Sequence, residues 1–251
     1  MDSASRIFWF SGTGNSLYAA KRLSEALYMP LSRITSEAYS GAVGGKGEKA
    51  GFVFPSYYGN IPRAVSDFVS KLEIKPETYI FAVVTMGAVG QGSIGALNKA
   101  LKAKGLRLSY GRGIRMPRNY VIMYDPAKPE DSGTKLDKLN NKIDSIIAEI
   151  MAGKVTVKSL PVTASNLYRD IDKLDAMFNV SGVCTGCGQC EKICPVGNIR
   201  MSNGKPEWLH HCEHCVACIS WCPAKAINYG DRTQTRRRYR NPQIKANELI
   251  R

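Results

Sequence analysis

All eight cysteines of this 251-residue chain lie between Cys184 and Cys222. They form two copies of one pattern, "CTGCGQCEKICP" and "CEHCVACISWCP", in which every cysteine recurs 28 positions later. Both copies read C-x2-C-x2-C-x3-C-P, a spacing that chance produces about once in ten million start positions. The fold of this part of the chain must therefore place these thiols around the group that they bind.

The spacing favours iron–sulfur clusters. A cubane cluster needs four thiolates around one small volume, and a tight loop can supply three of them while the fourth comes from elsewhere. Because each copy offers a distant fourth cysteine, each cluster takes three ligands from one copy and one from the other. The ligands expected for cluster I are Cys184, Cys187, Cys190 and Cys222, and those for cluster II are Cys194, Cys212, Cys215 and Cys218.

Zinc is the alternative for these cysteines. Tetrahedral zinc sites are usually built from paired C-x2-C knuckles, which this pattern does not follow. The histidines crowd one end of the second motif, at His210, His211 and His214. Because the cysteines already complete two ligand sets, we expect the histidines to form hydrogen bonds rather than to bind metal.

The N-terminal sequence predicts a cytoplasmic protein. "MDSASRIFWFSG" has one basic residue and an apolar run of four, too short for a signal peptide. No stretch of the chain approaches the length of a transmembrane span. In a reducing compartment the thiols stay available for metal, so disulfides are not expected.

The first 165 residues alternate between apolar runs and helical patterns. Strands are predicted at 6–10, 31–34, 51–55, 79–86 and 106–115. Helical stripes of apolar residues follow Pro62, recur near Ile94 and extend over 136–150. This alternation predicts an α/β fold, a doubly wound parallel sheet of five strands in the order 2-1-3-4-5.

Three neighbouring strands of that sheet end in unusual loops: "SGTGNS", "PSYYGNIP" and "TMGAVGQG". We expect these loops to meet at one edge of the sheet. The first offers glycines, hydroxyls and a helix N-terminus to a phosphate, although a capped helix start fits equally well. Tyrosines of the second suit the face of a planar ring, and backbone amides of the third suit its polar edge. Together they describe flavin mononucleotide (FMN).

The motif "SGTGNS" makes the first 165 residues resemble a flavodoxin, and residues 181–230 resemble a bacterial two-cluster ferredoxin. The whole chain is similar to the flavodoxin and bacterial-ferredoxin fusion proteins of anaerobes. Three other stretches also resemble sequences that recur in that family: "MPRNY" (116–120), "GKPEW" (204–208) and "RYRNP" (238–242). The sequence assigns these three stretches no role.

The resemblance implies noncovalent FMN and two 4Fe-4S clusters. The residues that would hold the phosphate are Ser11, Gly12, Thr13, Gly14, Asn15 and Ser16. The isoalloxazine ring would lie beside Pro55, Ser56, Tyr57, Tyr58, Gly59 and Asn60, with its polar edge near Thr85, Met86 and Gly87. Tyr57 and Tyr58 would flank the ring, and Gly59 is the candidate for a peptide that flips to bond the one-electron-reduced flavin.

Four segments are expected along the chain. They are a flavodoxin-like domain over 1–165, a linker helix over 166–180, a small α+β ferredoxin domain over 181–230 and a basic tail over 231–251. In the linker, apolar residues fall on one helical face, which favours a docked helix.

The formal net charge of +14 is unevenly spread, with seven Lys or Arg and no acid between Glu77 and Asp125. Such a face predicts an acidic redox partner, a ferredoxin or a reductase. It also predicts a higher potential for the second flavin reduction than in an acidic flavodoxin. Nucleic acid is the rival partner, but no recognition motif is found.

The function expected from this sequence is electron transfer between a redox partner, the clusters and FMN. Two alternatives stay open: an FMN-dependent reductase of a quinone or activated alkene, and a redox-sensing binding protein. "GQGSIG" (90–95) has the glycine spacing of a dinucleotide fingerprint, but it follows the fourth strand rather than the first and no acidic residue lies about twenty positions on. We therefore assign it to the third flavin loop.

Overall fold

The computed structural model describes residues 5–35, 39–87, 90–126, 133–159 and 171–250. The chain divides into two compact units. Unit 1 comprises Met1–Phe10, Ser16–Met116 and Glu130–Tyr168, and unit 2 comprises Ser11–Asn15, Pro117–Pro129 and Arg169–Arg251. The units do not follow a single cut through the sequence, because the loop Ser11–Asn15 belongs with the cysteine-rich segment. The domain boundary expected near residue 165 lies outside the described residues.

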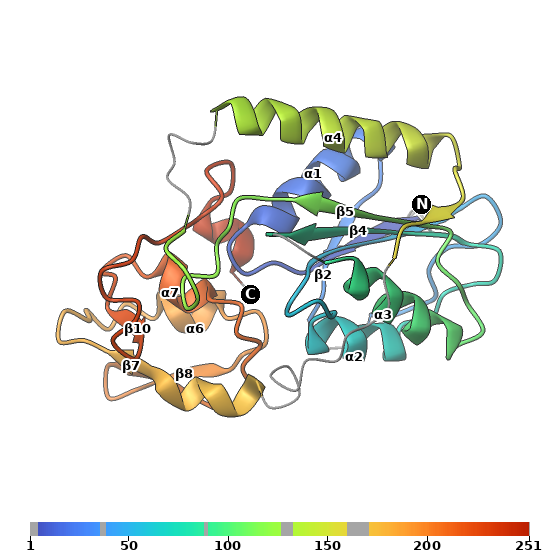
Figure 1. Cartoon of the computed structure of the whole chain (residues 1–251). Coiled ribbons are helices and arrows are strands. Elements are labelled where there is room, and N and C mark those ends of the chain that lie inside the picture. Colours follow the sequence, from blue (N-terminus) through green and yellow to red (C-terminus); the bar gives the residue numbers. More distant parts are fainter. Residues whose placement is uncertain (1–4, 36–38, 88–89, 127–132, 160–170, 251) are drawn as a thin grey trace. The chain divides into compact units, whose positions relative to one another are not determined.

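Unit 1 is built on a six-stranded sheet in the order β2-β1-β3-β4-β5-β6, in which all neighbouring strands are parallel (Figure 1). The strands are β1 (Arg6–Trp9), β2 (Leu31–Arg33), β3 (Lys49–Pro55), β4 (Tyr79–Met86), β5 (Tyr110–Arg115) and β6 (Thr156–Val157). The predicted order of the first five strands is confirmed. The sixth was not predicted, because two residues are too few to show a periodic pattern.

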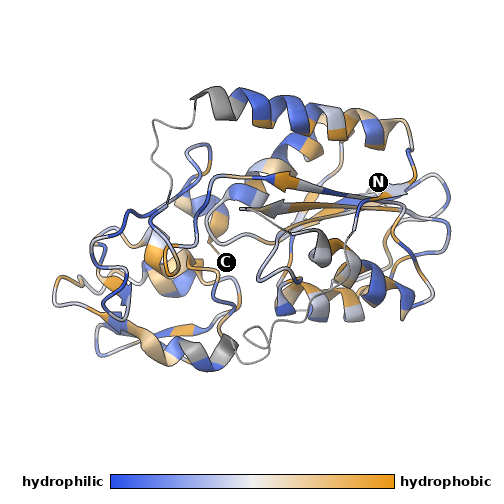
Figure 2. Cartoon of the chain, in the orientation of Figure 1, coloured by the Kyte–Doolittle hydropathy of each residue, from blue (hydrophilic) through white to orange (hydrophobic). Residues whose placement is uncertain are grey.

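Helices cover both faces of this sheet, with α1 and α4 on one side and α2 and α3 on the other (Figure 1). Their bounds are α1 (Asn15–Leu27), α2 (Arg63–Lys71), α3 (Gln91–Lys102) and α4 (Gly133–Met151). Hydrophobic and hydrophilic residues alternate along α4 (Figure 2), as expected for a helix with one buried face. The buried side chains of that face are Leu139, Ile143, Ile146, Ile147 and Ile150.

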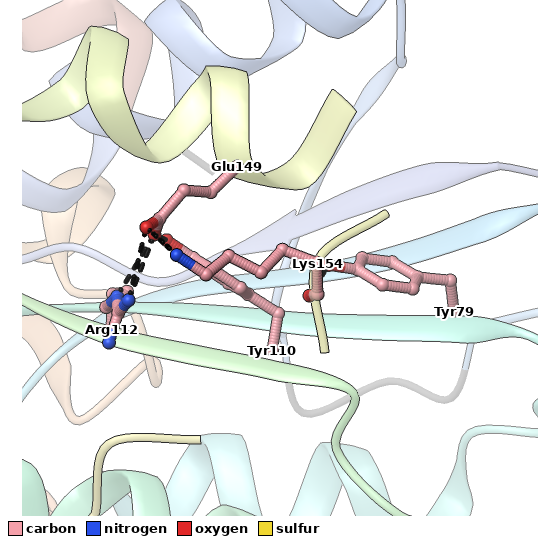
Figure 3. Close-up of polar contacts among 5 residues, drawn as sticks. All are labelled: Tyr79, Tyr110, Arg112, Glu149 and Lys154. Atoms are coloured by element: carbon pink, nitrogen blue, oxygen red, sulfur yellow. Dashed lines mark hydrogen bonds and ion pairs between the residues drawn. The ribbon is translucent and has the colours of Figure 1, made fainter. Parts of the chain in front are cut away.

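One ion-pair network ties α4 to the sheet (Figure 3). The carboxylate of Glu149 accepts hydrogen bonds from the Tyr110 hydroxyl at 2.6 Å, from Lys154 Nζ at 2.6 Å and from Arg112 Nη2 at 3.1 Å. Arg112 is only 8% exposed. One of the seven cations expected on the basic face is therefore buried and paired.

We expect Glu149→Gln to lower the stability of unit 1 at neutral pH. Bonds from Lys154 and Tyr110 lower the pKa of Glu149 from 4.5 to about 2. A carboxylate whose pKa is depressed by folding stabilises fully above its unfolded value and loses that effect as pH falls through its folded value. Urea unfolding should thus separate the variant from the wild type above pH 4.5 and bring them together near pH 2. A difference that did not change with pH would contradict this assignment.

Unit 2 holds two small antiparallel sheets, β7 (Phe178–Val180) with β10 (Ile227–Tyr229) and β8 (Ile199–Ser202) with β9 (Lys205–Trp208). Two short helices, α6 (Gln189–Ile193) and α7 (Ala217–Trp221), each contain the third cysteine of a motif. The linker helix was expected over 166–180. Its described part is instead a 3-10 helix (Ile171–Met177) followed by β7, and β7 belongs to a sheet of this unit. Within the described residues, no helix is both long and apolar enough to cross a membrane.

Candidate functional site

The two cysteine motifs fold alike. Gly188 precedes α6 with φ 70°, and Val216, 28 positions later, precedes α7 with φ 54°. Two more pairs at the same separation share positive φ values, Gly186 with His214 and Gly197 with Lys225. Left-handed backbone costs a non-glycine residue about 1–3 kcal/mol, so it persists only where its surroundings require it. The two motifs therefore repeat in backbone conformation as well as in sequence. This holds even at the positions where the first motif has glycine and the second has another residue.

The four cysteines expected for cluster I line one hollow that is partly open to solvent. Three come from the first motif, and Cys222 comes from the end of α7. Among the described residues, no three His, Cys, Asp or Glu side chains converge as ligands of a single metal ion do. Four cysteines around one hollow supply the number of thiolates that a cubane cluster needs.

The cysteines expected for cluster II are more deeply placed, with Cys194, Cys212 and Cys218 each no more than 8% exposed. Burial raises the pKa of the Cys212 thiol to about 12 and raises the pKa of Cys215 and of Cys218 well above the usual value. These thiols keep their protons at neutral pH unless a metal replaces them. A metal that binds here must therefore displace those protons.

Backbone amides point at the sulfur atoms of both sets. The His214 N–H lies 3.2 Å from Cys212 Sγ, and the Asn198 N–H lies 3.2 Å from Cys194 Sγ. In the cluster I set, the Ala226 N–H lies 3.3 Å from Cys222 Sγ. Such N–H···S hydrogen bonds stabilise thiolate charge and help to set the reduction potential of a cluster.

The histidines are hydrogen-bonded, as expected. His210 Nδ1 lies 2.7 Å from the buried carboxylate of Asp175, and His214 Nδ1 lies 2.9 Å from the Tyr120 hydroxyl. His211 lies within 3.2 Å of two backbone carbonyls. The stretch "GKPEW" contains the whole of β9, and its tryptophan stacks on Phe178 with the ring centroids 5.4 Å apart. That stretch therefore serves the packing of unit 2.

The other two unexplained stretches hold the first loop, Ser11–Ser16, which we call the phosphate loop. From "MPRNY", Asn119 Nδ2 donates to Thr13 Oγ1 at 2.6 Å. From "RYRNP", the Asn241 N–H donates to the Thr13 carbonyl at 2.9 Å. The Tyr239 hydroxyl and Asn241 Nδ2 both donate to Asn15 Oδ1, at 2.7 and 3.0 Å. All these residues belong to unit 2. Sequence reasoning singled out the stretches but could not find their target, more than 100 positions away.

The phosphate loop keeps the donors that an anion needs. Asn15 Nδ2 donates to the Pro117 carbonyl at 3.2 Å, so that its whole side chain supports the loop rather than a ligand. Ser11 Oγ accepts the Gly14 N–H at 3.1 Å and still has its own proton to donate. Within the described part of the chain, the N–H groups of Gly12 and Thr13 have no hydrogen-bond partner. With α1 starting at Asn15, these groups fit a phosphate.

The second loop is a tight turn. Tyr57 and Asn60 exchange two backbone hydrogen bonds, at 3.0 and 2.9 Å. The two residues between them, Tyr58 and Gly59, have φ of 51° and 78°. Positive φ at both central positions is the geometry of a type I′ turn, which glycine favours. Both tyrosines are partly exposed after β3, which ends at Pro55.

Unit 1 brings the ends of the three loops together. Ser16 Oγ lies 2.7 Å from Thr85 Oγ1, and the Ser56 N–H donates to the Thr85 carbonyl at 2.8 Å. The buried Ser93 hydroxyl lies 2.8 Å from both Ser56 Oγ and the Asn60 carbonyl. Met86 is buried and Gly87 is exposed. Ser93 comes from "GQGSIG", which was assigned to the third flavin loop, whereas residues 91–95 lie in α3, the helix that begins at Gln91.

Comparison with known proteins supports two 4Fe-4S clusters in the cysteine-rich segment. Residues 183–227 match the family model described as a 4Fe-4S dicluster domain. Over 45 residues the chain is 47% identical to one subunit of the ion-translocating oxidoreductase complex of Methanosarcina acetivorans. That match covers 18% of this chain and 17% of the other protein.

Two crystal structures resemble part of the chain. A proposed flavoprotein from Bacteroides uniformis is 16% identical with a TM-score of 0.37, covering 46% of this chain and 92% of its own. Another from Bacteroides eggerthii is 20% identical with a TM-score of 0.35, covering 43% and 87%. Similarity at this level carries no argument about function. From the family match and the repeated cysteine geometry together, residues 183–227 form a 4Fe-4S dicluster domain.

Proposed function

We propose that this protein transfers electrons between an external one-electron redox protein, two 4Fe-4S clusters and noncovalently bound FMN. The observation that carries the proposal is the dicluster domain, whose first set of four cysteines lines a single hollow. The ligands proposed for cluster I are Cys184, Cys187, Cys190 and Cys222, and those for cluster II are Cys194, Cys212, Cys215 and Cys218. Clusters of this kind carry single electrons and need no catalytic acid or base.

The residues around the phosphate loop support FMN as the second centre. The N–H groups of Gly12 and Thr13, which have no partner among the residues that the structure describes, and the hydroxyls of Ser11 and Thr13 would hold its phosphate. The partly exposed Tyr57 and Tyr58 would lie against its ring, and Gly87 near the ring's polar edge. When bound, FMN supplies a centre that takes up two electrons singly or as a pair.

The partner is proposed to be an acidic redox protein. The C-terminal turn of α3 and the segment after it expose Lys99, Lys102, Lys104 and Arg107. Complementary charge speeds the encounter of two proteins and orients them, and salt weakens the effect. Arg112 does not contribute to this surface, because it is buried against Glu149.

The test is an anaerobic count of iron, sulfide and flavin on the purified chain. We expect about eight irons, eight sulfides and one FMN per chain. A lower iron count would remove one cluster, and absence of FMN would remove the flavin half of the proposal.

A kinetic assay separates the proposed function from its alternatives. Reduced protein should pass electrons quickly to an acidic ferredoxin and slowly to quinones or activated alkenes. Fast reduction of one small molecule with no protein partner would favour a reductase instead. No turnover with any acceptor would favour a redox sensor.

A further inference from the structure

Gly12 of the phosphate loop lies directly against Cys215, a proposed ligand of cluster II. A Cβ atom placed on Gly12 would lie 2.4 Å from the Cys215 carbonyl oxygen and 2.9 Å from the Cys215 Cβ. Real side chains do not approach so closely, so only glycine allows this contact. Cys215 Cβ is bonded to the sulfur that would bind iron. The phosphate loop therefore touches an atom one bond away from a cluster ligand.

Trp221 holds Gly12 in this position. Its indole Nε1 donates to the Gly12 carbonyl at 3.0 Å, and the ring is 5% exposed. The guanidinium of Arg240, from "RYRNP", lies 5.7 Å from the centre of the same ring. These contacts all belong to unit 2, so they do not depend on how the two units are arranged.

We propose that cluster II is the cluster that exchanges electrons directly with FMN, and that cluster I exchanges with FMN only through cluster II. Gly12 reaches the cluster II set through the side chain of Cys215 itself. Among the described residues, its hydrogen bond toward the cluster I set is to the indole of Trp221, and the backbone then joins Trp221 to Cys222. This inference rests on the proposed function, and it adds the order of the centres: redox partner, cluster I, cluster II, FMN.

Each transfer in this order moves one electron. Reduced cluster II loses one electron and returns to its oxidised state, while FMN gains that electron. Cluster I then loses one electron to cluster II, and the reduced one-electron redox protein restores cluster I. Two such cycles deliver two electrons to FMN, and the protons that accompany full reduction come from solvent.

Pulsed EPR on the full-length holoprotein tests the order. A flavin radical relaxes faster when a nearby cluster is paramagnetic, and the effect falls steeply with distance. Cys187→Ser replaces an exposed ligand of cluster I by oxygen, which shifts the potential and the EPR signal of that cluster alone. We expect fast relaxation of the flavin radical to set in with reduction of the unshifted cluster. If fast relaxation instead set in with reduction of cluster I, whose potential is shifted, the inference would be overturned.

Two further results keep the test decisive. If Cys187→Ser removes cluster I altogether, fast relaxation must persist, and its loss would overturn the inference. If that variant does not fold, Gly12→Ala must weaken the relaxation effect by pushing the loop away from Cys215, whereas Gly182→Ala, with no atom near its added Cβ, must not. Equal relaxation in these two variants would overturn it. Absence of FMN from the wild type would remove the proposed function as well, which distinguishes the two failures.

Discussion

Removal of iron from the holoprotein is expected to unfold unit 2. The buried core of this unit contains four of the cysteines, Cys190, Cys194, Cys212 and Cys218, beside residues such as Ile219 and Tyr229. A core this small does not hold a domain together by apolar burial alone. In small metal-dependent domains the binding free energy is the folding free energy, on the order of 10 kcal/mol. We therefore expect the ordered structure of unit 2 to be lost with its clusters.

The measurement is near-ultraviolet circular dichroism and tryptophan fluorescence during chelation under reducing conditions. Trp208 and Trp221 both lie in unit 2, so their signals report on it. Cys218→Ala should reproduce the loss for cluster II without chelator. Val183→Ala is the matched control, because this neighbour of the first motif is 62% exposed and is not a ligand. A chelated protein that still unfolds cooperatively with native tryptophan signals would contradict the expectation.

Asn15→Ala is expected to cost about 2–5 kcal/mol in the free energy of unfolding of unit 2. The substitution removes the acceptor of both the Tyr239 hydroxyl and the Asn241 amide, and the donor to the Pro117 carbonyl. The buried Asn241 amide left without a partner costs about 1–3 kcal/mol, and loss of each of the two part-buried hydrogen bonds adds about 0.5–1 kcal/mol. The phosphate loop would also lose its hydrogen bonds to Tyr239 and Asn241, so we expect weaker FMN binding as well.

Asn15→Asp separates the two effects. Its carboxylate still accepts both hydrogen bonds from the tail, but it loses the donor to Pro117 and adds negative charge beside the proposed phosphate. We expect it to weaken FMN binding more than it lowers stability, as measured by flavin titration and by urea unfolding of the same samples. Gln234→Ala, at an exposed turn, should change stability by no more than about 0.5 kcal/mol. Unchanged stability of Asn15→Ala would contradict the role of Asn15.

Local patterns predicted most of the architecture. The uninterrupted apolar run of β4 and the helical stripes of α2 and α4 reflect burial along one element, which periodicity records directly. The strand order followed from the α/β alternation, and the order in turn predicted that the loops after β3 and β4 would meet. The hydrogen bond from the Ser56 N–H to the Thr85 carbonyl agrees with that prediction. The 28-residue repeat of the cysteines is accompanied by a repeat of positive φ angles, as at Gly188 and Val216.

Long-range contacts could not be predicted in this way. Asn119 and Asn241 lie 106 and 226 positions from their partners in the phosphate loop. A periodic pattern in a short segment carries no information about hydrogen bonds between residues so far apart in the sequence. The left-handed backbone at Val216 was equally unpredictable, since valine ordinarily avoids it.

By itself, the sequence determined the parallel sheet of unit 1, the two cysteine motifs and the edge of the sheet where three loops meet. These features depend on burial and spacing along short segments, and a chain carries them in its order of residues. Only the tertiary structure decided that the "MPRNY" and "RYRNP" segments form hydrogen bonds with the phosphate loop and that Gly12 packs on Cys215. Those contacts join distant segments, and they exist only once folding has brought their backbones within hydrogen-bonding and van der Waals distance.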